Sequence, residues 1–64
     1  MKPPRPITLD DEINEVVREI ELRERAYPKM IEARRLRQDH ADRRSAVMLA
    51  VLQRLRRLRE SGHA

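Results

Sequence analysis

The sequence has no cysteine, one glycine and a single aromatic residue, Tyr27, in its 64 positions. Without cysteine, neither a disulfide nor a thiolate metal site can stabilise so short a chain. The only histidines, His40 and His63, are too far apart in sequence to form a compact metal motif. No apolar run approaches the ~20 residues that span a bilayer, and the first residues lack the hydrophobic stretch of a signal peptide. We therefore expect a cytoplasmic protein with no metal or other cofactor.

What the chain does contain is typical of long helices: 41% of its residues are charged, and alanine, leucine, glutamate and arginine dominate. The charges are unevenly placed. Residues 1–33 carry six basic and eight acidic side chains, whereas residues 34–64 carry nine arginines and three acidic side chains. Because the two halves have opposite net charge, they attract one another when the chain folds back on itself.

The N-terminal residues 1–7 contain three of the four prolines, which predicts a flexible, extended arm. Thr8 can cap a helix by accepting a hydrogen bond from the Asp11 amide, and three acidic residues follow in the first turn. Apolar residues then recur at intervals of three and four, namely Leu9, Ile13, Val16, Val17, Ile20, Tyr27 and Ile31. This spacing predicts a helix over about 9–34.

Pro28 either ends this helix at Tyr27 or kinks it, and the unbroken apolar phase through Ile31 favours a kinked helix. The stretch Ala33–Arg37 is the predicted turn, because the apolar phase restarts after it. A second helix is predicted over about 38–60, followed by a tail at 61–64. Its apolar face is predicted to comprise Ala41, Met48, Val51, Leu52, Leu55 and Leu58.

Two helices of similar length joined by a short turn predict an all-α fold, an antiparallel, coiled-coil-like two-helix hairpin over residues 8–60. With a turn centred near residue 35 or 36, Ile20 faces Val51 and Leu52, and Glu24 comes close to Arg44. We predict that Glu24 and Arg44 form a structural ion pair, since an unpaired charge on an apolar face is costly. The alternative is that each side chain extends outwards to solvent.

A hairpin of this size buries too little apolar surface to be comfortably stable alone. Four apolar residues also lie off the predicted helix–helix contact: Leu22, Met30, Val47 and Leu49. We therefore expect a homodimer that forms a four-helix bundle.

The sequence offers little support for catalysis, because a hairpin has no cleft and the common polar residues near His40 form no recognisable triad. The acidic cluster at residues 10–15 is better explained as a helix cap than as a cation site. Nucleic-acid binding is the more serious alternative, because α-helical arginines can neutralise phosphates. The candidate basic patch consists of Arg54, Arg56, Arg57 and Arg59.

Two segments resemble parts of small uncharacterised proteins of temperate bacteriophages and prophages. They are the run Arg23-Glu24-Arg25-Ala26-Tyr27-Pro28 and the later residues Ala41-Asp42, Ala46, Met48, Ala50-Val51-Leu52 and Leu55. The resemblance covers roughly Leu9 to Leu58 and implies a helical hairpin in a phage context, with no particular activity. This sequence has Arg34 in the turn, where the pattern implies glycine.

That context implies an adaptor or inhibitor of a host or phage protein, including an anti-defence role, in the host cytoplasm. The candidate partner-binding residues are Tyr27, Met30, Arg34 and Arg35, with packing of Tyr27 against the second helix as the competing interpretation. The sequence thus predicts a non-enzymatic, homo-oligomeric accessory protein that acts by protein–protein binding. A basic nucleic-acid-binding protein is the alternative.

Overall fold

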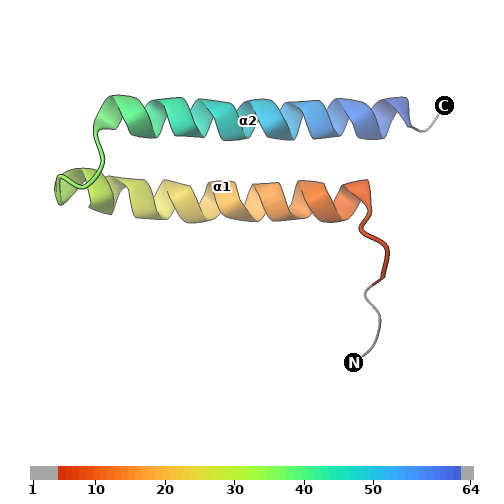
Figure 1. The fold of residues 1–64 in the computed structure, drawn as a ribbon, viewed down its shortest axis with the longest axis horizontal. Coiled ribbons are helices and arrows are strands. Elements are labelled where there is room, and N and C mark those ends of the chain that lie inside the picture. Colours follow the sequence, from red (N-terminus) through yellow and green to blue (C-terminus); the bar gives the residue numbers. More distant parts are fainter. Residues whose placement is uncertain (1–4, 63–64) are drawn as a thin grey trace.

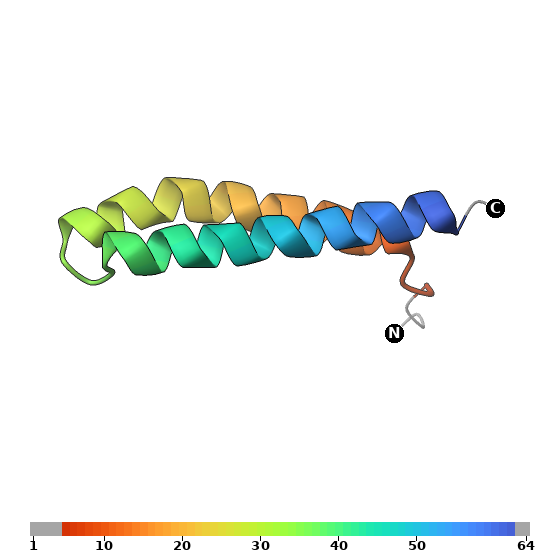
Figure 2. The same ribbon diagram turned by 90° about the horizontal axis from the view of Figure 1, so that it is seen from above.

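The computed structural model describes residues 5–62, which form an antiparallel pair of α-helices, α1 (Leu9–Glu32) and α2 (Gln38–Ser61). The helices lie side by side and are joined by one short loop (Figures 1 and 2). The predicted all-α hairpin is confirmed, and the helix bounds fall within two residues of those predicted. Residues 1–4 of the predicted arm and 63–64 of the predicted tail lie outside the described residues.

Helix α1 begins at a complete capping box. The Asp11 amide donates to the Thr8 hydroxyl at 3.1 Å, and the Thr8 amide donates to the Asp11 carboxylate at 3.0 Å. These bonds satisfy two backbone donors, and the one that the Asp11 carboxylate accepts from the Thr8 amide lowers the pKa of Asp11 below its ordinary value. The helix then continues through Pro28 to Glu32. The alternative in which the helix ends at Tyr27 is therefore wrong, and the kink at Pro28, which cannot donate a bond to the Glu24 carbonyl, stays a prediction.

The loop at Ala33–Arg37 closes α1 with two bonds. The Arg35 amide donates to the Met30 carbonyl at 2.8 Å, and the Arg34 amide donates to the Ile31 carbonyl at 3.0 Å. This pattern is a Schellman motif, whose central position adopts left-handed backbone geometry and usually holds glycine. Here that position is Arg34, with φ of 60°. Arg34, which stands where the phage-protein pattern implies glycine, therefore occupies the left-handed position of the turn.

The best-packed region lies next to this loop, where Tyr27, Leu36 and Ala41 form a buried cluster flanked by Met30 and Ile31. Leu36 is a loop residue, yet only 8% of it is exposed, because it folds under the end of the two helices. It supplies a third element to the helix pair. Met30, which was predicted to lie off the contact between the helices, packs against this cluster instead.

Along the rest of α2, the less exposed residues follow alternating steps of four and three: Ala41, Ser45, Met48, Leu52, Leu55 and Arg59. This is the spacing of a coiled-coil contact. Two residues predicted for this contact are too exposed to belong to it, Val51 at 39% and Leu58 at 53%. The prediction was wrong at both because each precedes a contact residue by one position, which rotates it about 100° away.

In this hairpin, a residue of α1 and a residue of α2 lie at the same height along the helices when their numbers add to about 69. Asp10 and Arg59 form an ion pair at 3.2 Å near the open end. Near the loop, Glu24 and Ser45 line the same groove, as do Pro28 and Ala41. The predicted pairing of Ile20 with Val51 and Leu52 is two to three residues away from this register. Within residues 5–62, neither helix is long and apolar enough to cross a membrane.

Candidate protein-binding surface

Within residues 5–62, five of the six large, strongly exposed apolar side chains lie on one face of the hairpin, which we call the valine face: Ile7, Leu22, Val47, Val51 and Leu58. Val47, Val51 and Leu58 share one side of α2 because they are separated by four and seven residues. Ile7 and Val51 line one groove together with Glu15, and Leu22 follows Glu15 by two helical turns. The sixth residue, Leu49, lies on another side of α2, since two residues rotate the helix by about 200°.

The groove on the valine face has an apolar floor and an acidic border. Val16 from α1 and Val51 and Leu55 from α2 lie along it, with Ile7 at one end. Asp11, Glu12 and Glu15 line its α1 side, and it encloses about 570 Å³ open to solvent. An apolar groove with a charged rim is the arrangement that buries well against another protein surface.

The two edges of the valine face carry opposite charges. Glu12, Glu15 and Glu19 follow one another along the α1 edge at intervals of three and four, and the one arginine among them, Arg18, leaves this edge acidic on balance. On the α2 edge, Arg44 and Arg54 occupy the same stripe as Val47, Val51 and Leu58. Each edge is thus complementary to the other edge of an identical face.

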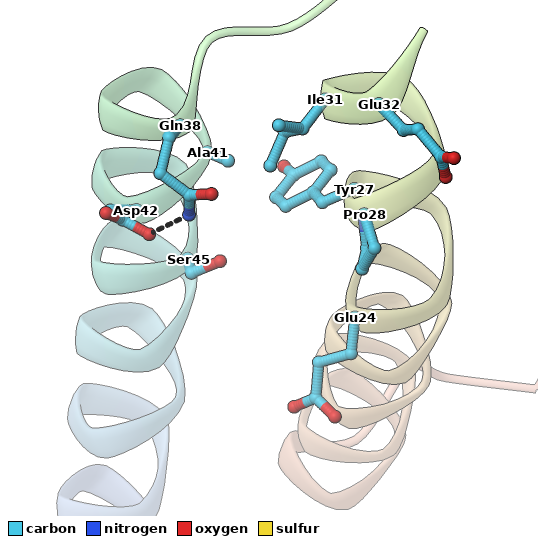
Figure 3. Close-up of a pocket in the computed structure, with 9 residues that line it drawn as sticks. All are labelled: Glu24, Tyr27, Pro28, Ile31, Glu32, Gln38, Ala41, Asp42 and Ser45. Carbon is cyan, nitrogen blue, oxygen red and sulfur yellow. Dashed lines mark hydrogen bonds between the residues drawn. The ribbon is translucent and has the colours of Figure 1, made fainter.

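A second groove lies on the opposite side of the hairpin, next to the loop (Figure 3). It encloses about 450 Å³ and is lined by Glu24, Tyr27, Pro28, Ile31, Glu32, Gln38, Ala41, Asp42 and Ser45. The Gln38 amide donates to the Asp42 carboxylate at 2.9 Å, which fixes one rim of the groove. Within residues 5–62, no three acidic or histidine side chains lie close enough to hold a metal ion.

The candidate partner-binding residues are divided by the structure. Tyr27 is buried in the loop-end cluster and Met30 packs against it, so the packing interpretation of Tyr27 is favoured. Arg34 and Arg35 are exposed on the loop, where their charges also suit the negative end of α1. Of the four candidates, the two arginines are therefore the ones exposed to a partner at this end.

The candidate basic patch is not continuous. Arg59 pairs with Asp10 across the open end, and its side chain is 41% exposed. Arg54 and Arg57 lie about 60° apart around α2, whereas Arg56 lies about 200° from Arg54. These four arginines therefore point in several directions, which weakens the case for a phosphate-binding surface.

The predicted ion pair between Glu24 and Arg44 does not form. Among residues 5–62 the ion pairs are Glu19–Arg23, Arg37–Asp39 and Asp10–Arg59. Glu24 lines the groove beside Pro28, whereas Arg44 lines a different groove beside Val47 and Met48. The two side chains flank the buried Tyr27 from opposite sides, and both are exposed.

The half-buried charge on α1 is instead Arg23, one position earlier. Its guanidinium donates to the Glu19 carboxylate and to the Glu19 carbonyl. The bond to the Glu19 carboxylate raises the pKa of Arg23 above its already high value. Arg23 thus lines a groove with residues of α2, but its charge is paired with Glu19 on its own helix. An acidic partner from α2 is therefore not needed.

Comparisons of the chain with protein-family models, with curated proteins and with solved structures found no match. The candidate surface is therefore inferred from the residues of this chain alone. Sequence reasoning did note that Leu22, Val47 and Leu49 lie off the helix–helix contact. It missed that Leu22 and Val47 share a face with Val51 and Leu58, because those two were placed inside the hairpin.

Proposed function

We propose that this chain is a small, non-enzymatic accessory protein that acts by protein–protein contact, as an adaptor or an inhibitor of a host or phage protein. The single observation that carries the proposal is the valine face, where five exposed apolar side chains share one side of the hairpin with acidic residues of α1 and arginines of α2. Exposed apolar surface gathered on one side of a small chain marks an interaction site, because leaving it in water is unfavourable. The resemblance to small bacteriophage proteins supplies the biological context.

The first partner of the valine face is another copy of the chain, which gives a homodimer. The accessible surface is 5949 Å² for a mass of 7.7 kDa. A compact monomer of that mass exposes about 4300 Å², so the excess is roughly 1600 Å². The residues outside the two helices contribute part of this excess, and the exposed apolar side chains of the valine face contribute another part.

The loop end is left for the protein that the dimer acts on. Arg34 and Arg35 are exposed there, and Lys29 lies one turn away on α1. Arginine is enriched in protein interfaces because its planar group binds carboxylates in two places at once. An acidic surface on the partner is the chemistry that this end fits.

A pair of matched substitutions tests the valine face. Val47 and Leu49 are equally exposed, at 49% and 48%, but lie on different sides of α2. We expect Val47→Glu to raise the dissociation constant of self-association about a hundredfold, because it buries a charge in the interface. Leu49→Glu should leave it within about threefold. Sedimentation velocity measures both, and equal effects of the two variants would contradict the proposal.

The nucleic-acid alternative is tested separately. If arginines bind phosphates, a gel shift with DNA or RNA must be present at low salt and weaken steeply as salt rises. We expect no salt-sensitive shift, because the four arginines of the candidate patch diverge around α2 and one of them is paired with Asp10.

A further inference from the structure

We propose that two copies pair across the valine face in parallel, with both loops at the same end and with α1 of each copy against α2 of the other. This proposal specifies the geometry of the self-association proposed above and depends on it. The two-fold axis then runs along the helices. All four neighbouring helix pairs in the resulting bundle are antiparallel, which is the common arrangement of four-helix bundles.

Symmetry fixes the contacts in such a dimer. Rotation about an axis parallel to the helices changes no residue's height along that axis, so each residue faces partner residues at its own level. Levels follow from the register of the hairpin, in which Asp10 lies opposite Arg59. Residues whose numbers add to 69 are therefore level, and no sliding of one copy along the other can alter this.

Two pairs of residues at matching levels are complementary, whereas Val51 is level with Arg18 and Leu58 with Asp11. Leu22 on the α1 edge is level with Val47 on the α2 edge, and both are nearly half exposed in a single hairpin. Glu15 is level with Arg54, and each lies at an edge of the valine face. In the parallel dimer, Leu22 of one copy faces Val47 of the other copy, and Glu15 faces Arg54. The two-fold symmetry makes each of these contacts occur twice. Apolar side chains thus meet apolar ones, and a glutamate meets an arginine.

The reversed arrangement is electrostatically worse. With the two-fold axis across the helices, α2 lies on α2 of the other copy with its direction inverted. When the two hairpins overlap fully, Arg54 then lies near the level of Arg43 and Arg44 of the second copy. Like charges facing each other in an interface are unfavourable.

Distance measurement between spin labels separates the two arrangements. The chain has no cysteine, so Arg35→Cys places one label on each loop. We expect a label–label distance of about 30 Å or less in the parallel dimer, because the loops are then neighbours. The reversed dimer separates them by more than about 36 Å, the length of a 24-residue helix. A label at Glu21→Cys, near mid-helix, is the control, because its distance hardly differs between the arrangements.

A charge exchange provides an independent test by sedimentation. Glu15→Arg and Arg54→Glu should each raise the dissociation constant of the dimer about tenfold, and the double variant should return it to within about threefold of the original. Circular dichroism checks that each variant stays helical.

Each outcome decides the matter. A short loop distance with recovery in the double variant supports the parallel dimer. A long loop distance, or no recovery, overturns the parallel geometry while leaving the valine face as a contact surface. A chain that remains monomeric overturns the second copy as the occupant, and with it the self-association proposed above.

Discussion

The loop half and the open half of this hairpin are built from the same two helices but are packed very differently. At the loop, Leu36 folds beneath Tyr27 and Ala41, so a third element closes the core. At the open end no such element is present in residues 5–62, and Ile7, Val51 and Leu58 remain exposed beside the Asp10–Arg59 ion pair. Two helices alone leave one side of each helix bare. A hairpin is therefore complete only where something else covers it.

Removing the third element should have the largest effect on this contrast. Leu36→Ala deletes a nearly buried side chain from the loop-end cluster. We expect the free energy of unfolding to fall by about 2 to 4 kcal/mol, from lost burial and the cavity left behind. Urea denaturation followed by circular dichroism measures it. Arg35→Ala is the neighbouring control and should change stability by less than about 0.5 kcal/mol. Equal losses in the two variants would show that Leu36 does not close the core.

Relieving the turn should strengthen the loop half further. Arg34 has φ of 60°, where a side chain costs roughly 1 to 2 kcal/mol and glycine costs little. Arg34→Gly should therefore raise the free energy of unfolding by about 1 kcal/mol, part of the gain being offset by the flexibility of glycine in the unfolded chain. If partner binding depends on the arginine, the same variant will be more stable but bind less tightly. A loss of stability would contradict the left-handed geometry of this position.

Weakening the N-terminal cap should loosen the open half. Thr8→Ala removes the hydroxyl that accepts from the Asp11 amide and should lower the free energy of unfolding by about 1 kcal/mol. Thr8→Ser keeps the hydroxyl and should retain most of the stability. Amide hydrogen exchange of the first turn of α1 reports the change locally. Unchanged exchange in Thr8→Ala would mean that the capping box does not hold that end.

Acidification should have a smaller effect at the same place. The bond from the Thr8 amide lowers the pKa of Asp11 below 3.8, its ordinary value. A lowered pKa means that the carboxylate stabilises the folded chain above pH 3.8, and this contribution disappears as pH falls through the folded-state pKa. The wild-type chain should lose its advantage over Asp11→Asn below about pH 4. If the melting temperatures of the two chains differ by the same amount at every pH, ionisation of Asp11 does not stabilise the folded chain.

The sequence was informative about the helices and less so about their faces. The Thr8 cap and the turn at Ala33–Arg37 were predicted correctly because caps and phase breaks are local signals. Between Ile20 and Tyr27 the helix–helix contact passes through either position 23 or position 24, and both are charged. Apolar periodicity cannot choose between them, so Glu24 was predicted at the contact that Arg23 occupies.

The candidate surface was harder to predict for a related reason. At two places in α2 an exposed apolar residue stands directly before a contact residue: Val51 before Leu52, and Leu58 before Arg59. A prediction that favours apolar residues therefore places Val51, Leu52 and Leu58 all inside the hairpin. Only the register shows that Arg59 takes the inner position while Leu58 turns outwards. Leu36 was missed because it follows a run of arginines in a turn, where burial is unusual.

If a second copy completes the open half, the stability of the folded chain depends on protein concentration. If folding is coupled to dimerisation, raising the chain concentration a hundredfold adds about 2.7 kcal/mol to the apparent free energy of unfolding. The midpoint of urea denaturation should then rise by about 1 to 2 M when the chain concentration is raised from about 1 µM to about 100 µM. A midpoint that stays constant over this range would contradict the account.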